Sequence, residues 1–157
     1  MQETSVVFEK VIQLLEQAEV GYELLRHEPV RTAQEASKIR GTSIKEGVKA
    51  IIFAADGKPV LVCVSGDRRV DSKVFKGAYG VKDLRLLSPE DVLQLTGLEV
   101  GAIPPLGKVM NLPTYLDKMV LENDYVCFNA GSHTRSIKMR TVDFVKLATP
   151  EIGDFSC

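Results

Sequence analysis

The 157-residue sequence has no tryptophan, only two histidines and only three cysteines. No C-x-x-C pair or close His/Cys spacing surrounds His27 or His133, so we expect no metal and no other cofactor. Cys63 and Cys127 lie in apolar, strand-like runs and are expected to be small core residues, whereas Cys157 is expected to be exposed. An odd number of cysteines cannot all pair with one another, which favours a reduced, cytoplasmic protein.

Long hydrophobic runs and an excess of charge of one sign are also missing. No apolar stretch approaches the length of a membrane span, and the N-terminus lacks the basic and apolar segments of a signal peptide. The formal net charge is −1, so any contact with RNA would need a local basic patch. We expect one soluble cytoplasmic domain, residues 1–157, with no membrane partner.

Several motifs of known chemistry are absent as well. No glycine-rich turn joins a strand to a helix as in a dinucleotide-binding fold, and there is no P-loop. No G-x-S-x-G elbow is present, and Ser132 and His133 are adjacent, so on a strand they would point to opposite faces. The sequence therefore gives little support to covalent catalysis by a serine triad.

Hydrophobic periodicity predicts alternating helices and strands. The first helix, within residues 1–20, is expected to be capped by Thr4 and ended by Gly21, and the second to begin with a Thr32/Glu35 capping box. Asp56-Gly57 predicts a hairpin, and residues 150–157 are expected to form a tail. The expected strands are residues 22–26, 48–54, 59–64, 84–87, 125–129 and 135–139. This order predicts an α+β fold with a mixed, mostly antiparallel, strongly bent or barrel-like sheet and flanking helices.

Two segments of the central region are candidates for a binding site. Lys49 enters an apolar strand, although a lysine at the edge of a sheet that reaches solvent is an alternative interpretation. The loop Gly101–Gly107 combines glycines, which permit close backbone approach, with the stiff pair Pro104-Pro105. A plain connection remains an equally good interpretation of that loop.

Two later segments are also candidates. Thr114 and Asp117 end a strand-like run, where an aspartate is more often a turn or helix cap than a ligand. Gly131, Ser132 and His133 form a polar connection between two strands, and a simple hairpin turn explains the glycine and serine equally well. The histidine is the more informative residue of the three.

The order of these segments resembles the YbaK/ProX-like aminoacyl-tRNA editing domains, relatives of the insertion domain of bacterial prolyl-tRNA synthetase. The resemblance runs from about Tyr22 to Leu147. It rests on the segments His27–Pro29, Thr32–Ala36, Val48–Ile52, Gly66-Asp67, Thr96-Gly97, the G-x-x-x-P signature Gly101–Pro105, Leu112–Asp117 and Gly131-Ser132.

The resemblance implies a trans-acting deacylase that hydrolyses the ester of a mischarged tRNA. Alanyl- or cysteinyl-tRNA specific for proline is the expected substrate, the tRNA 3′ end is the expected partner, and a synthetase is a second possible partner. The catalytic positions that it implies are Lys49, Gly101, Ser132 and His133. The substrate-binding positions that it implies are Tyr22, His27, Thr32, Ala102, Ile103, Pro104, Pro105, Thr114, Asp117 and Gly131. A non-catalytic module that binds a tRNA end or a synthetase, and a hydrolase of small esters, are the alternatives.

Overall fold

The computed structural model describes residues 5–30 and 32–157. Its helices are α1 (Val6–Ala18), α2 (Ala33–Arg40), α3 (Ser72–Tyr79), α4 (Pro89–Thr96) and α5 (Thr141–Ala148), with short 3₁₀ turns η1 (Ile44–Glu46), η2 (Gly107–Met110) and η3 (Lys118–Glu122). Its strands are β1 (Tyr22–Arg26), β2 (Val48–Ala55), β3 (Lys58–Ser65), β4 (Leu84–Leu86), β5 (Thr114–Asp117), β6 (Tyr125–Asn129), β7 (Arg135–Arg140) and β8 (Glu151–Gly153). None of the described helices is long and apolar enough to cross a membrane.

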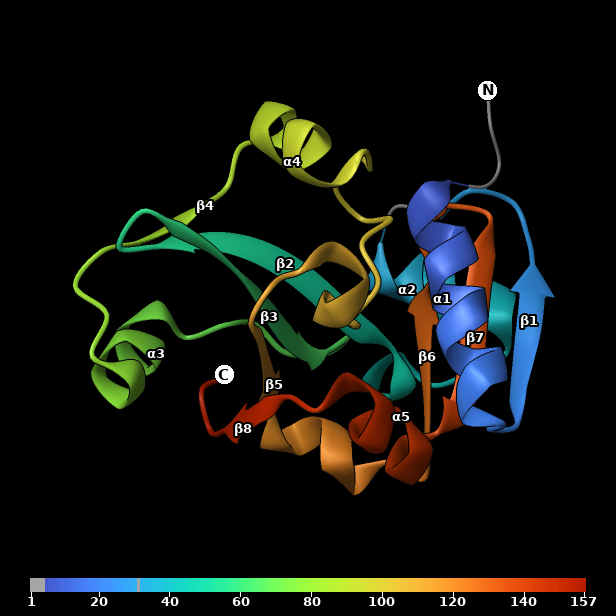
Figure 1. Cartoon of the computed structure of the whole chain (residues 1–157). Coiled ribbons are helices and arrows are strands. Elements are labelled where there is room, and N and C mark those ends of the chain that lie inside the picture. Colours follow the sequence, from blue (N-terminus) through green and yellow to red (C-terminus); the bar gives the residue numbers. More distant parts are fainter. Residues whose placement is uncertain (1–4, 31) are drawn as a thin grey trace.

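The strands form two sheets. An antiparallel sheet has the order β1-β7-β6, and a mixed sheet has the order β4-β2-β3-β5-β8. In Figure 1 the smaller sheet stands on the right, with α1 in front of it and α2 behind, and the larger sheet extends to the left. The predicted α+β class and the mixed sheet with flanking helices are confirmed, but the sheets do not close into a barrel.

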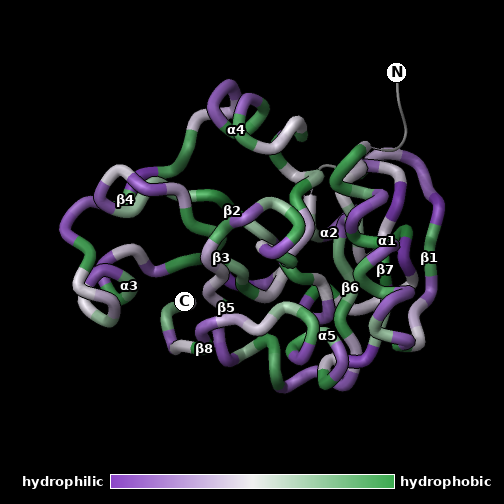
Figure 2. The backbone as a smooth tube through the Cα atoms, viewed as in Figure 1, coloured by the Kyte–Doolittle hydropathy of each residue, from purple (hydrophilic) through white to green (hydrophobic). Residues whose placement is uncertain are grey.

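The larger sheet is built on the β2–β3 hairpin. Asp56 and Gly57 have φ angles of 49° and 83°, as a tight two-residue hairpin turn requires. Strand β3 is buried along most of its length, and it appears as a largely hydrophobic segment in Figure 2. Leu61 and Cys63 of β3 pack in one hydrophobic cluster, and Val60, Val62 and Val64 pack in another, so apolar side chains cover both faces of the strand.

Two expected helix boundaries differ from those observed. Ser5 caps α1 by accepting a hydrogen bond from the Phe8 amide at 3.0 Å, and Thr4 lies outside the described residues. Helix α1 ends at Glu19, which takes the left-handed conformation expected of Gly21. The Thr32 cap of α2 is confirmed by a 3.1 Å bond from the Glu35 amide.

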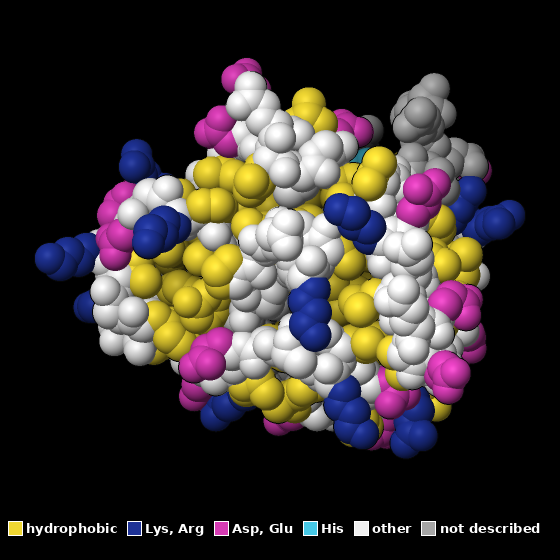
Figure 3. Space-filling view, viewed as in Figure 1, with side chains coloured by type: hydrophobic (Ala, Val, Ile, Leu, Met, Phe, Trp, Pro, Cys, Tyr) yellow, Lys and Arg dark blue, Asp and Glu magenta, His cyan; other side chains and the backbone are white. Residues whose placement is uncertain are grey.

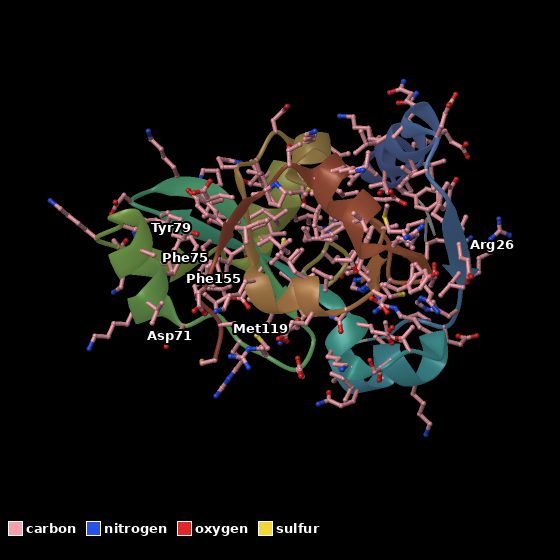
Figure 4. The ribbon with its side chains drawn as sticks, turned by 90° about the horizontal axis from the view of Figure 1, so that it is seen from below. Arg26, Asp71, Phe75, Tyr79, Met119 and Phe155 are labelled. Carbon is pink, nitrogen blue, oxygen red and sulfur yellow. The ribbon has the colours of Figure 1, made fainter. Side chains whose placement is uncertain are left out.

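The segment 150–157, expected to be a tail, is part of the fold. It forms β8 beside β5 and then buries Phe155 against Phe75 and Tyr79 of α3, as Figure 4 shows. The amides of Phe155 and Ser156 donate to the buried carboxylate of Asp117 at 2.8 and 3.0 Å. A carboxylate from the middle of the chain therefore fastens its last residues.

The two sheets meet where β2 begins. Gly47, just before β2, forms an isolated parallel bridge with Cys127 of β6. This seam brings the start of β2, the end of α2 and the β6–β7 connection close together, and the candidate site lies at this place.

Candidate functional site

A pocket of about 330 Å³ opens at the seam between the sheets. Its walls come from α2 and the turn after it, the start of β2, the loop after α4, the end of β6 and the connection between β6 and β7. The residues that line it are Val30, Thr32, Ala33, Ala36, Ser37, Arg40, Thr42, Ile44, Gly47, Val48, Lys49, Ala50, Ile51, Gly66, Val100, Gly101, Ile103, Asn129 and His133.

Lys49 is the second residue of β2 and is half-buried at this wall. Burial lowers the pKa of Lys49, and Arg69 lowers it further, while the nearby carboxylate of Asp67 opposes the shift. The ammonium group is thus partly removed from water. A cation in such a place attracts an anion more strongly than a cation in open solvent does.

Arg40, the last residue of α2, supplies a second cation. Its Nε donates to Ser136 Oγ at 3.0 Å, and Nη2 donates to Asn129 Oδ1 at 2.8 Å. Burial lowers the pKa of Arg40, but an arginine remains charged throughout the physiological range. Both of these partners are neutral, so the positive charge is not balanced there.

His27 supports this arrangement from behind. Its Nε2 lies 2.7 Å from Ser136 Oγ, and its Nδ1 lies 2.8 Å from the carbonyl oxygen of Glu28. His27 does not line the pocket. It fixes the serine that holds Arg40, so its connection with the site is indirect.

The loop that carries Gly101 is held against His133. Gly101 has a φ of +94°, and a β-carbon added to it would lie 3.3 Å from His133 Cε1. The side-chain amide of Asn129 donates to the Gly101 carbonyl oxygen at 2.6 Å. His133 Nε2 lies 3.8 Å from Glu99 Oε1 at the exposed rim. A larger residue at position 101 would therefore strain the backbone and require the histidine to move by a few tenths of an ångström.

The permanent charges among the described lining residues have one sign. Arg40 and Lys49 line the pocket together with the imidazole of His133, and the described lining residues include no aspartate or glutamate. A pocket of this kind suits an anionic ligand.

The structure brings together five of the positions expected from the sequence: Thr32, Lys49, Gly101, Ile103 and His133 all line the pocket. The other loop positions lie next to it. Ala102, Pro104 and Pro105 are buried in the stem of the loop.

Gly131 and Ser132 shape the loop of His133 from the side away from the pocket. Gly131 packs on the start of α1 and accepts a 2.8 Å hydrogen bond from Ser5. Ser132 is buried, and its Oγ accepts a bond from the Thr134 amide at 3.1 Å. Both residues therefore act on the loop conformation and do not line the pocket.

Three expected substrate-binding residues lie elsewhere and have local structural partners. The Tyr22 hydroxyl donates to Glu16 at 2.7 Å, and the Thr114 hydroxyl donates to the Leu112 carbonyl oxygen at 3.2 Å. Asp117 caps η3 and holds the C-terminal segment. None of the three lines the pocket.

Sequence reasoning missed Arg40, Asn129 and Thr42. Arg40 reads as an ordinary basic residue at the end of a helix, and Asn129 as the start of a hairpin turn. Thr42 Oγ1 is buried at the wall and has no hydrogen-bond partner among the described residues. No local signal marks Arg40 or Asn129, because their hydrogen bonds join segments far apart in sequence.

The described part of the site offers positive charge and a shaped cavity but no activated covalent nucleophile. Burial raises the pKa of the Cys63 and Cys127 thiols, which disfavours the reactive thiolate. The described residues contain no cluster of His, Cys, Asp or Glu that could hold a metal. The arrangement suits positioning of an anionic ester so that water or a hydroxyl of the substrate can attack it.

Comparisons with known proteins agree with this geometry. A family model described as "Aminoacyl-tRNA editing domain" matches residues 27–147. The Multifunctional Ser/Thr-tRNA deacylase ProXp-y of Escherichia coli (strain K12) is 32% identical over 160 residues, which covers 99% of this chain and 96% of that protein. The Proline--tRNA ligase of Solidesulfovibrio magneticus is 37% identical over 97 residues, 60% of this chain but 16% of the ligase.

A comparison with solved structures also finds an editing protein. A crystal structure described as a candidate trans-editing enzyme for prolyl-tRNA synthetase superimposes with a TM-score of 0.85 at 28% identity, with 98% of both chains covered. The expected family is confirmed: because the match spans residues 27–147 of 157, the chain belongs to the aminoacyl-tRNA editing domain family.

Proposed function

We propose that this chain hydrolyses, in trans, the ester bond between a wrongly attached small amino acid and the 3′ end of a tRNA. The observation that carries the proposal is the pocket lined by Arg40, Lys49 and His133, with no carboxylate among its described lining residues, in a chain of the editing family. A polyanionic substrate and a labile ester both suit such a site. Hydrolysis needs mainly positioning and polarisation of the ester carbonyl.

The roles of the residues follow from their places in the pocket. Lys49 binds a phosphate at the 3′ end of the tRNA, and the loop at Gly101 places backbone groups near the ester carbonyl. The oxygen of water attacks the carbonyl carbon, and the bond from that carbon to the esterified ribose oxygen breaks. Attack by the neighbouring ribose hydroxyl would only move the aminoacyl group to the other ribose oxygen, so water must still complete the hydrolysis. In the hydrolytic route the ribose oxygen takes up a proton, and the free amino acid and the tRNA leave.

His133 faces this loop from the opposite lip, where an imidazole can accept or donate a hydrogen bond during these steps. Ser132 supports the histidine by holding the loop through Thr134. Ser132 is thus proposed as a positioning residue and not as a nucleophile.

The pocket favours a small amino acid. The α2 side of its wall carries Ala33 and Ala36, with the hydroxyl side chains of Thr32, Ser37 and Thr42 close by in sequence. Alanine and cysteine are the amino acids expected from the sequence, and serine and threonine are those named for the E. coli relative. Because one methylene changes binding by only about 1–3 kcal/mol, all four belong in the test.

The tRNA is proposed to bind mainly through its 3′ end. Figure 3 shows Lys and Arg scattered among acidic and apolar side chains on the visible face, and the net charge is −1. A synthetase that holds the rest of the tRNA is a second proposed partner, since relatives of this domain occur within proline--tRNA ligases.

A deacylation assay tests the proposal. Wild-type protein and Lys49→Ala are compared on tRNAs charged with alanine, cysteine, serine and threonine. We expect acceleration on at least one, and a loss of about 10- to 100-fold in kcat/KM for Lys49→Ala, the range expected for a hydrogen bond to a charged group.

The matched control is Lys58→Ala, which removes an exposed lysine from the far end of the same hairpin. It should hydrolyse these substrates at the wild-type rate. No acceleration by wild type on any substrate would favour the non-catalytic binding module. Equal rates for wild type and Lys49→Ala would remove Lys49 from the mechanism.

A further inference from the structure

Arg40 places a positive charge in a half-buried position without an acidic partner among the described residues. Its Nε and Nη2 donate to the neutral side chains of Ser136 and Asn129. The ion pairs found among the described residues are Arg85–Asp83, Lys118–Asp154 and His133–Glu99. A partly buried charge is costly when it is not paired, so Arg40 needs an explanation other than stability.

One end of the guanidinium is still available. Nη1 has no hydrogen bond to the described residues, and it would lie 3.7 Å from a β-carbon placed on Gly47. Arg40 and Gly47 both line the pocket, as does Lys49. The unused donor therefore lies at the wall that also holds the lysine.

The Nη2 atom of the guanidinium is linked through Asn129 to the loop that carries Gly101. Arg40 Nη2 donates to Asn129 Oδ1 at 2.8 Å, and Asn129 Nδ2 donates to the Gly101 carbonyl oxygen at 2.6 Å. Two hydrogen bonds thus connect the arginine with Gly101. An anion that fixes Arg40 would also fix the position of that loop.

We propose that Arg40 is a second anion-binding residue, which binds the phosphodiester between the last two nucleotides of the tRNA together with Lys49 and holds the Gly101 loop through Asn129. Identification of the ligand as a tRNA phosphodiester rests on the proposed function. The planar guanidinium suits this task because it can donate to phosphate oxygens while its other nitrogens keep their protein partners.

The test compares two small ligands that need no hydrolysis. Cytidylyl-(3′→5′)-adenosine contains the phosphodiester, and adenosine lacks it. Calorimetry is expected to show that wild type binds the dinucleotide more tightly, and that Arg40→Gln loses about 10- to 100-fold of dinucleotide affinity while its affinity for adenosine stays the same. The dinucleotide affinity should also fall less steeply with added salt in Arg40→Gln than in wild type, because salt screens the attraction between the arginine and the phosphodiester.

Arg26→Gln is the matched control. Arg26 is an exposed residue of β1, and it lies at the outer edge of the molecule in Figure 4. The substitution removes the same charge from an exposed position that does not line the pocket, so it should leave both affinities unchanged. An equal loss with Arg26→Gln would mean that overall charge, and not Arg40, attracts the dinucleotide, which would overturn the proposal.

Two other outcomes would also overturn the proposal: unchanged dinucleotide affinity in Arg40→Gln, or an equal loss for dinucleotide and adenosine, which would indicate a purely structural role. If circular dichroism shows that Arg40→Gln does not fold, Arg40→Lys takes its place. The Arg40→Lys variant keeps the positive charge but loses the branched set of guanidinium donors, so it should bind the dinucleotide over adenosine with a smaller preference than wild type does. An undiminished preference would count against the proposed role of Arg40. Absence of deacylation with these binding differences intact would contradict the proposed reaction and leave the anion site standing.

Discussion

Gly101 and His133 are packed so closely that a β-carbon on residue 101 would lie 3.3 Å from the Cε1 atom of the histidine. Gly101→Ala is expected to strain the backbone, because φ is +94° there, and to displace the imidazole. The first effect should lower the free energy of unfolding by roughly 1–2 kcal/mol, and the second should lower kcat/KM for deacylation.

Gly97→Ala separates the two effects. Gly97 has a φ of +75° with nothing within 4 Å of an added β-carbon, so this variant should lose stability and keep its activity. Chemical denaturation and deacylation assays on both variants check the expectation. If the two variants lost activity equally, the contact with His133 would have no part in the reaction.

We expect the charged Lys49 side chain to lower the stability of the fold, although it is proposed to bind the phosphate of the substrate. Burial lowers its pKa in the folded state, so the unfolded chain keeps the proton to higher pH, and stability rises with pH between the two pKa values. Below that window the charged lysine disfavours folding. Lys49→Met is therefore expected to raise Tm at pH 7, and this gain should shrink as pH rises toward about 10.4, the ordinary value for lysine.

Thermal unfolding at pH 7 and pH 10 tests this expectation for Lys49→Met, with the exposed Lys58→Met as the control that should change little. A lower Tm for Lys49→Met at pH 7 would show that the lysine stabilises the fold, contrary to the prediction.

Thr42→Val should leave stability unchanged or raise it slightly. The Thr42 hydroxyl is buried and has no partner among the described residues, so its removal breaks no hydrogen bond there. Thr141→Val is the contrasting substitution, because the buried Thr141 hydroxyl donates to the Asn123 carbonyl oxygen at 2.6 Å. That variant should lose about 1–3 kcal/mol. Urea denaturation of the pair gives the comparison, and a similar loss in both would indicate that Thr42 has a stabilising partner.

Asp117→Asn is expected to destabilise the fold without changing the kinetic constants of the folded protein. The carboxylate of Asp117 accepts bonds from the Met119, Phe155 and Ser156 amides and from the Ser156 hydroxyl. Asparagine replaces one of the two carboxylate oxygens with an NH2 group that cannot accept, so two of these four bonds are lost, and we expect the free energy of unfolding to fall by about 2–3 kcal/mol. Chemical denaturation and steady-state kinetics of Asp117→Asn test this prediction. An altered KM at unchanged stability would support the original expectation that Asp117 binds substrate.

The fold was largely predictable because its signals are local. Capping at Thr32, the Asp56-Gly57 turn and the alternating strands each depend on a few neighbouring residues, and they define the observed elements. The cap of α1 was missed because Thr4 and Ser5 are adjacent hydroxyl residues, which sequence does not distinguish. Strand β8 was missed because three residues carry little periodicity, and its anchor is a distant aspartate.

The site was predictable only in part, for the same reason. Lys49, Gly101 and His133 lie in unusual local sequences, and they do line one pocket; their roles remain predictions. The contact between Arg40 and Asn129 joins residues 89 positions apart. This hydrogen bond depends on the packing of α2 beside β6 and β7. No local sequence pattern predicts that packing.

The last residues of the chain have a practical consequence for experiments. Cys157 exchanges two backbone hydrogen bonds with Arg69, at 2.8 and 3.0 Å, and Arg69 and Asp67 both act on the pKa of Lys49. A purification tag joined after Cys157 would therefore be attached beside the charges that tune the pocket. Binding constants measured with such a tag should be compared with those measured after its removal.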